Sequence, residues 1–320
     1  MKFLLRRLLH AGFLLAGVSV MSFLLLQLAP GDFFADMQLN PQISPQTIAA
    51  LRGQFGLDRP IAVRYLRWLQ SAARGDFGYS FAYNSPVAPL LGTRARNTAI
   101  LAGVSTAIAW LLALVLGVWG AARAGHWDDR LCTGVMALSL ALPDVLVALV
   151  LLLVAVRTRA FPVGGMVSTG FNVLTPVHKV MDICLHMALP VFALVFALAP
   201  TLVRHVRATV VDALSAPCVR AARAHGIAPV RLMLHHVLPL AANPLISLFG
   251  VSLATLLSVS LLVEVIMAWP GLGPFFLEAI LARDVYIVIG TVLFSTVFLV
   301  AGNLIADGLL FAADPRIRRK

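Results

Sequence analysis

Long runs without charge are the feature that most constrains this chain. A helix needs about 20 apolar residues to cross the roughly 30 Å hydrocarbon core of a bilayer. Six stretches of the sequence meet that length, the third interrupted only by Asp144: residues 8–29, 97–122, 131–156, 185–203, 240–263 and 285–306. Of the 320 residues, 60% are hydrophobic and only 12% are charged, against about 25% charged in soluble domains. We therefore predict an all-α, polytopic membrane protein with six transmembrane helices.

Basic residues indicate the orientation of these spans. The first run is longer than a signal-peptide core and has no A-x-A-like site after it, so we interpret it as an uncleaved span. The two tails, the 123–130 turn and the 204–239 loop then share one side and hold fourteen Lys and Arg, whereas the opposite short loops hold four. Because basic residues concentrate in cytoplasmic loops, both termini are expected in the cytoplasm. The net charge of +11 is then an orientation signal and does not indicate nucleic-acid binding.

The long outer loop, residues 30–96, is expected to contain short helices. Ser44-Pro45 is an N-cap followed by proline at the first helical position. Residues 61–73 are amphipathic and include Tyr65 and Trp68. Two compatible interpretations remain: an interfacial cap on the bundle, since Trp and Tyr favour the headgroup level, or a platform for an external partner.

The inner loop, residues 204–239, predicts a compact helical pair. Ser215 is expected to cap a first short helix, and Gly226 to end it in the left-handed conformation. Pro229 is expected to begin a second helix that ends near Pro239. We call residues 215–239 the knob. Its small and basic residues favour insertion into a groove of another protein, and anchoring to anionic lipid is the alternative.

The knob resembles the cytoplasmic signature of permease subunits of ATP-binding-cassette (ABC) importers. That signature is Glu-Ala-Ala, three residues, Gly, nine residues, Ile, one residue and Leu-Pro. Here Arg220-Ala221-Ala222 is followed by Gly226, His236 and Leu238-Pro239. Arg220 and His236 depart from the general pattern, but an arginine in the first position is typical of the dipeptide/oligopeptide/nickel-type permeases.

Further motifs of that branch recur in order along the chain. They are Leu5–Leu8, Pro30–Asp32, Leu51–Phe81, Glu264–Gly273, Ala279–Asp284 and Asp314–Arg318. The chain departs from the family at Arg94–Thr98, where an Arg-Leu-Pro-Ala-Thr run is usual, and at Pro217-Cys218, which replaces an Asp-Tyr pair.

The resemblance implies a type I ABC importer permease (MetI-like) bundle in the bacterial inner (plasma) membrane. Four segments are expected: an N-terminal tail and first span (1–29), an extracytoplasmic loop subdomain (30–96), a permease core with the coupling loop 204–239 (97–312), and a cytoplasmic tail (313–320). The implied partners are a second homologous permease, two cytoplasmic ATPases and an extracytoplasmic solute-binding protein, in contact with membrane lipid and without nucleic acid.

No cofactor is expected on this chain. Lysine occurs only at positions 2, 179 and 320, so no Gly-x-x-x-x-Gly-Lys-Ser/Thr loop exists to hold a nucleotide. ATP and Mg²⁺ are therefore expected on the partner ATPases. The sequence also has no Gly-x-Ser-x-Gly or His-Glu-x-x-His motif and no second aspartate suited to pair with Asp144, so we expect a transport subunit and no catalytic residues.

The candidate site residues form two sets. For coupling to an ATPase the resemblance implies Arg220, Ala221, Ala222, Arg223, Gly226, Leu238 and Pro239. For the pathway we single out Asp144 and Glu264, because charged groups inside a membrane are costly, although helix capping or a structural ion pair are alternative roles. The neighbouring His235 and His236 diverge by about 100° on a helix, so no metal site is expected there.

The expected function is ATP-driven uptake of di- or oligopeptides. Import of nickel or a metal chelate on the same scaffold is one alternative. A stand-alone secondary transporter or channel is another, supported by Asp144 and Glu264 but not by the knob.

Overall fold

The computed structural model describes residues 2–28, 44–54 and 59–313. The motif Pro30–Asp32 and the tail motif Asp314–Arg318 lie outside the described residues. The described chain forms two compact units, Met1–Thr98 with Pro270–Val300 and Ala99–Trp269 with Ala301–Lys320. We call them unit 1 and unit 2.

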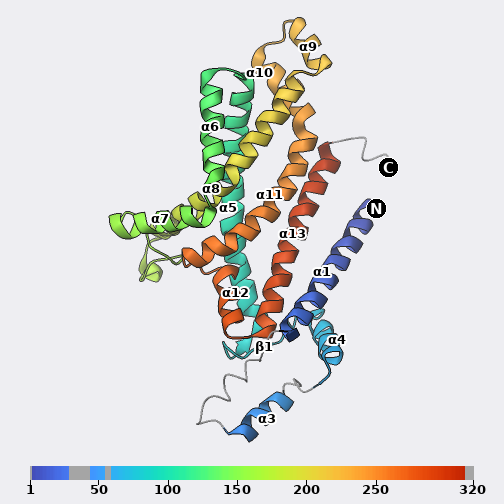
Figure 1. The fold of residues 1–320 in the computed structure, drawn as a ribbon, viewed down its shortest axis with the longest axis vertical. Helices are drawn as coiled ribbons and strands as arrows, with labels where there is room; N and C mark the ends of the chain where they lie inside the picture. The colour runs from blue at the N-terminus through green and yellow to red at the C-terminus, as the bar shows by residue number, and fades with distance from the viewer. Residues whose placement is uncertain (1, 29–43, 55–58, 314–320) are drawn as a thin grey trace. The chain divides into compact units, whose positions relative to one another are not determined.

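Nearly every element is a helix (Figure 1). Of the described elements, those that begin in unit 1 are α1 (Lys2–Leu28), α3 (Pro45–Gln54), α4 (Ile61–Ala72), β1 (Tyr79–Ser80), β2 (Ser85–Pro86), α5 (Val87–Ala122), α12 (Leu272–Leu281) and α13 (Val285–Ala313). Those that begin in unit 2 are α6 (Trp127–Ala141), α7 (Asp144–Thr158), the 3₁₀ turn η1 (Phe171–Val173), α8 (Pro176–Leu214), α9 (Pro217–Ala224), α10 (Pro229–Leu232), the π-helical segment η2 (Met233–Val237) and α11 (Leu238–Ile266).

The predicted apolar runs correspond to long helices. Among the described residues, five helices are long and apolar enough to cross a membrane, and six spans result if the bent pair of α6 and α7 counts as one. The predicted third run is not a straight helix, because α6 and α7 meet at an angle of 92°. Leu142 ends α6 with extended backbone angles, as expected for a residue whose α conformation is disfavoured by a following proline.

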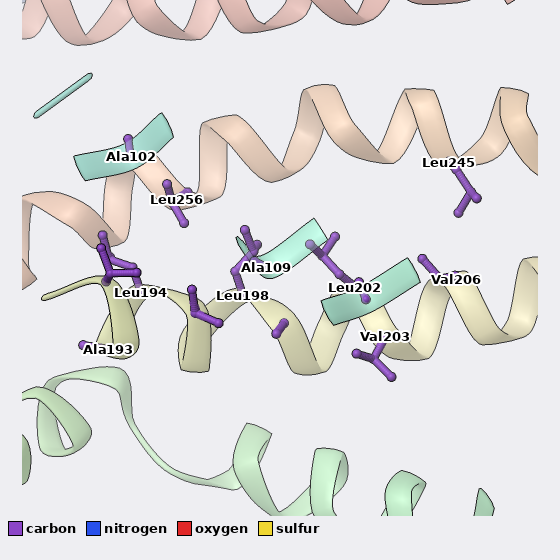
Figure 2. Packing of buried hydrophobic residues seen from close by; sticks show 14 of the residues in the cluster. Ala102, Ala109, Ala193, Leu194, Leu198, Leu202, Val203, Val206, Leu245 and Leu256 are labelled. Carbon is purple, nitrogen blue, oxygen red and sulfur yellow. The ribbon is translucent and has the colours of Figure 1, made fainter. Parts of the chain in front are cut away.

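The fourth run, which has two prolines, forms the centre of unit 2. Its helix, α8, is the most buried of the five long helices, and Pro190 and Pro200 lie inside it. Neighbouring helices α5, α6, α7 and α11 surround α8 and supply much of the apolar core. Figure 2 shows Leu194, Leu198 and Leu202 on one side of α8, facing α5 and α11. Their spacing of four residues places them on one helical face.

Helix α8 also extends beyond its predicted span. The predicted loop 204–239 begins as helix, and α8 ends only at Leu214. Val206 and Val210 are completely buried in this extension, so packing of an apolar stripe continues the helix past the expected end of the membrane.

In unit 1 the outer segment forms the predicted short helices. Ser44 caps α3, because its Oγ accepts a hydrogen bond of 3.1 Å from the Thr47 amide. The amphipathic helix α4 packs on α1 around Phe23 and Trp68, whose ring centroids are 5.8 Å apart. The two-residue strands β1 and β2 form an antiparallel hairpin, with Tyr79 opposite Pro86.

Candidate functional site

The first helix of the knob is capped by a different residue from the one that the sequence predicts. Pro217 is the first residue of α9, and Ala216 before it has extended backbone angles and takes the N-cap position. Ser215 does not cap α9. It is the C-cap of α8, and its Oγ donates a hydrogen bond of 2.7 Å to the Asp212 carbonyl. The correction follows from Pro217, which keeps Ala216 out of the helical region and leaves Ser215 on the preceding helix.

Gly226 ends α9 as predicted, through a Schellman motif. Its φ of +76° is left-handed, a conformation that glycine adopts without the penalty of a Cβ. The Ile227 amide donates to the Ala222 carbonyl at 3.4 Å, and the Gly226 amide donates to the Arg223 carbonyl at 3.0 Å. These two hydrogen bonds satisfy the last carbonyls of the helix and turn the chain sharply toward α10.

The knob has an apolar inner side and a basic outer side. Val219, Leu232 and Val237 are buried in the core of unit 2. Helix α9 presents its other faces to solvent, and the exposed candidate residues are Arg220, Ala221, Arg223 and Gly226. Ala222 is half-buried and packs against the same core. An exposed surface of arginine and small residues on a rigid support can bind a groove in a partner protein.

The second helix of the knob does not end near Pro239, in contrast to the prediction. Helix α10 passes into the π-helical segment η2, and α11 follows at once from Leu238. A proline inside a helix removes one amide donor and crowds the carbonyl four residues earlier, and π-bulges relieve such crowding. Leu238 is half-buried and Pro239 exposed at the start of α11, so they join the knob to the fifth predicted span without a break.

An ion pair supports the same end of unit 2 and was missed from the sequence. Asp129, in the first turn of α6, accepts hydrogen bonds of 2.5 and 2.7 Å from the Arg207 guanidinium on α8. The second oxygen of Asp129 also accepts one of 3.0 Å from the Gly125 amide. Only 2% of the Asp129 side chain is exposed. The acidic pair Asp128-Asp129 before an apolar run was the available signal, but its partner is 78 positions away.

The two candidate pathway residues lie in unit 2 but in different surroundings. Asp144 is the first residue of α7, directly after the 92° bend, and it is half-buried. A carboxylate in the first turn of a helix is favoured by the helix dipole. Glu264 is completely buried near the end of α11, and its backbone carbonyl accepts a hydrogen bond of 2.9 Å from the Trp269 amide.

The histidines of the knob are distributed over its surface. His225 and His235 are exposed, as is Cys218, whereas His236 is half-buried. Within the part of the chain that the structure describes, no three His, Cys, Asp or Glu side chains converge to hold a metal ion.

Several sequence motifs meet in unit 1 around the hairpin. One carboxylate oxygen of Asp284 accepts hydrogen bonds from the Ser80 hydroxyl (2.7 Å) and the Ala82 amide (3.2 Å). The other accepts one of 3.4 Å from the Ile287 amide and so caps α13. The Tyr83 hydroxyl donates to Glu278, and partial burial together with this carboxylate raises the pKa of Tyr83 to about 12.

A second junction joins the segment before the second span to the start of α12. The Asn97 amide group donates a hydrogen bond of 2.8 Å to the Pro270 carbonyl, and the Thr98 hydroxyl accepts one of 2.8 Å from the Leu272 amide. Asn97 and Thr98, which lie in the segment that departs from the family pattern, therefore supply two hydrogen bonds to this junction.

Known proteins resemble the chain over nearly its whole length. Residues 113–319 match the family described as "Binding-protein-dependent transport system inner membrane component", and residues 1–106 match the N-terminal region of such components. The oligopeptide transport system permease protein AppB of Bacillus subtilis is 34% identical, with 98% of each chain covered. OppB of Mycobacterium bovis, also an oligopeptide permease, is 33% identical, with 99% of each covered.

Two further similarities concern substrate and fold. The metal-staphylopine import system permease protein CntB of Staphylococcus aureus is 30% identical, with 99% of this chain and 98% of that one covered. A chain from the inward-facing MetNI methionine ABC transporter matches with a TM-score of 0.52 and 18% identity, over 69% of this chain and 96% of that one. The structural match shows the MetI-type permease fold.

Proposed function

Because the chain belongs to the family of inner-membrane components of binding-protein-dependent transport systems, we propose that it forms half of the translocation pathway of an ATP-driven importer of di- and oligopeptides. A second, homologous permease supplies the other half. The relatives AppB and OppB, which carry oligopeptide transport in their names, support the peptide substrate. The similarity to CntB supports import of a metal chelate as the second candidate.

The buried side and the exposed side of the knob together support a role in coupling. Its buried side is continuous with α8 and α11, since Val219 and Val237 are completely buried in the core. Its exposed side presents Arg220, Ala221 and Arg223. A rigid element with these two sides transmits displacement of a bound partner to the helices behind it. The partner need only bind the two states of the bundle with different affinity to shift their equilibrium.

ATP and Mg²⁺ are proposed to bind on two partner ATPases. The sequence has no nucleotide-binding loop, and the exposed surface of α9 has the small, basic character expected of a docking surface. The knob and both termini are proposed to face the cytoplasm, on the charge asymmetry of the loops. The hairpin of unit 1 then faces the solute-binding protein.

Substitution by a large side chain on the exposed side of the knob tests this proposal. Ala221→Trp is expected to weaken ATPase binding to the permease by about tenfold or more, as at a central interface residue, while the protein still inserts and folds. Ala124→Trp, at an exposed alanine in the turn between α5 and α6, is the matched control. The measurement is co-purification of the ATPases together with substrate-stimulated ATP hydrolysis in proteoliposomes. Normal stimulation with Ala221→Trp would refute coupling through α9.

Substrate class is tested on the solute-binding protein that co-purifies with the complex. Mass spectrometry of its bound ligand is expected to find short peptides. A bound metal chelate would instead favour the second candidate. Uptake driven by an ion gradient, by the purified chain alone, would contradict both and support a secondary transporter.

A further inference from the structure

Three arginines surround a cavity that the proposed function does not use. The cavity lies in unit 1 beside α4 and has a volume of about 460 Å³. Arg59, Arg64 and Arg67 line it, with Asp76 as the acidic residue among the lining side chains. One Asp76 oxygen accepts a hydrogen bond of 2.9 Å from the Gly78 amide. The lining is therefore strongly cationic, and its volume lies in the range of small-ligand sites.

Aromatic side chains form the other walls of the cavity. Trp68 is 5% exposed, and its indole nitrogen donates a hydrogen bond of 3.1 Å to the Phe77 carbonyl, which holds the ring in place. Tyr79 of the hairpin and Tyr286 of α13 complete the lining. A cavity lined by three arginines and aromatic side chains suits a phosphate or carboxylate, because arginine binds these groups through paired hydrogen bonds.

The position of α4 along the membrane normal favours a lipid over a soluble anion as the ligand of this cavity. The Tyr65 hydroxyl lies 2.9 Å from the Ser19 hydroxyl, and the Tyr65 ring contacts Phe23 at 5.4 Å between centroids. Both α1 residues belong to the apolar stretch Leu9–Leu26 that is long enough to span the membrane. Figure 1 shows α4 beside the end of α1. Phe23 is three residues from the end of that stretch, so we place α4 near the level where acyl chains meet headgroups.

The exposed face of α4 fits this level. Leu66 is 63% exposed, and Val63 and Leu69 are also exposed. In water these side chains would leave an unfavourable apolar stripe, whereas an amphipathic helix at a membrane interface buries such a stripe in the acyl region. Arg67 follows directly on Leu66, so the same helix offers contacts to acyl chains and to a headgroup.

We propose that this cavity binds the headgroup phosphate of an anionic phospholipid, with Arg64 and Arg67 as its ligands and the exposed leucines of α4 against its acyl chains. The proposal does not depend on peptide import, and its test measures lipid binding directly.

The test uses the full-length chain with its partner subunits in nanodiscs of phosphatidylcholine that contain phosphatidylglycerol. Native mass spectrometry is expected to find phosphatidylglycerol retained in preference to phosphatidylcholine. Arg64→Gln combined with Arg67→Gln is expected to reduce that preference by about tenfold or more, since charge-assisted hydrogen bonds to phosphate are lost. Arg67→Gln alone, at an exposed position, reduces it partly. The control Arg74→Gln changes an exposed arginine of the same segment that does not line the cavity, and retains the preference.

Two comparisons separate the sources of the anion. Inorganic phosphate is expected not to displace the retained lipid, and displacement would assign the site to a soluble phosphate instead. Capture of the solute-binding protein in pure phosphatidylcholine is expected to be the same for wild type and the double variant. If the double variant captured less solute-binding protein than wild type, and to the same extent with and without anionic lipid, the arginines would instead bind an acidic segment of that protein. Equal retention of both lipids by the wild type would also overturn the proposal.

Discussion

At the scale of single residues, Gly226 shows how one backbone conformation shapes the proposed docking surface. Its φ is +76°, and a Cβ built on it would meet no atom within 4 Å. A side chain at position 226 would therefore meet no steric clash, and only the left-handed backbone conformation disfavours it. Substitutions at this position therefore test the backbone conformation separately from packing.

We expect Gly226→Asn to be nearly neutral, Gly226→Ala to cost about 1 kcal/mol of knob stability, and Gly226→Val to cost more. Asparagine tolerates the left-handed region, whereas a β-branched residue is strongly disfavoured there. Thermal unfolding and ATPase affinity of the three variants are the measurements. Identical behaviour of all three would contradict the role of the backbone conformation and point to contact of the residue with its partner.

The ion pair between Asp129 and Arg207 is the second feature at this scale. Asp129→Ala is expected to destabilise the chain by about 2 kcal/mol. That is less than the roughly 3–5 kcal/mol of a fully buried pair, because 30% of the Arg207 side chain is exposed. Arg207→Lys keeps the charge but loses the paired geometry, so it is expected to recover only part of the stability.

Asp128 provides the control for this ion pair, since it pairs with Arg123, whose side chain is 58% exposed, and its own side chain is 12% exposed against 2% for Asp129. Exposed pairs contribute little to stability, so Asp128→Asn should leave the melting temperature almost unchanged. An equal shift for substitutions at 128 and 129 would show that the burial of Asp129 has no special weight.

At the scale of elements, helix α13 and the hairpin segment share a common carboxylate. Asp284 is completely buried, caps α13 and receives two hydrogen bonds from the segment Ser80–Ala82. A carboxylate that accepts three donors adds a polar link between the hairpin segment and α13, which also share aromatic contacts such as Phe81 with Tyr286.

Asp284→Ala is expected to destabilise unit 1 by about 2–4 kcal/mol, from the lost helix cap and the lost charge-assisted hydrogen bonds. Ser80→Ala removes one of these hydrogen bonds and should cost about 1 kcal/mol. Limited proteolysis of residues 79–86, followed by mass spectrometry, measures release of the hairpin. Cleavage at the wild-type rate in Asp284→Ala would show that other contacts hold the hairpin.

At the scale of the whole molecule, the chain belongs to a permease family, and the proposed coupling and pathway roles depend on its orientation in the membrane. The proposed orientation places the knob on the cytoplasmic side, where the ATPases are proposed to bind. The three cysteines allow that orientation to be measured, because Cys218 is an exposed residue of α9.

In a Cys132→Ser, Cys184→Ser background, Cys218 is expected to react with a membrane-impermeant maleimide in inside-out vesicles and not in right-side-out vesicles. Bound ATPases should protect it. Thr169→Cys, in the exposed loop after α7, is expected to show the opposite pattern in a background without Cys218. Labelling of Cys218 from outside would reverse the proposed orientation.

Much of the fold followed from local chemistry. The apolar runs, the Ser44 cap of α3, the amphipathic helix at Ile61–Ala72 and the left-handed stop at Gly226 were predictable, because each depends on residues a few positions apart. The role of Ser215 was wrong and the end of the second knob helix was misplaced, because buried side chains extended α8 and a π-helical segment carried the chain past Pro239.

The sequence by itself determined that this protein lies in a membrane, because apolar length and charge are properties of the chain alone. It also determined the small, basic composition of the knob. Only the tertiary structure decided that Arg207 meets Asp129, that Ser80 meets Asp284, and that three arginines and three aromatic rings surround one cavity. The two hydrogen-bonded pairs are 78 and 204 positions apart, and Tyr286 reaches the cavity from another part of the sequence, so helix packing decides these contacts and no local pattern specifies them.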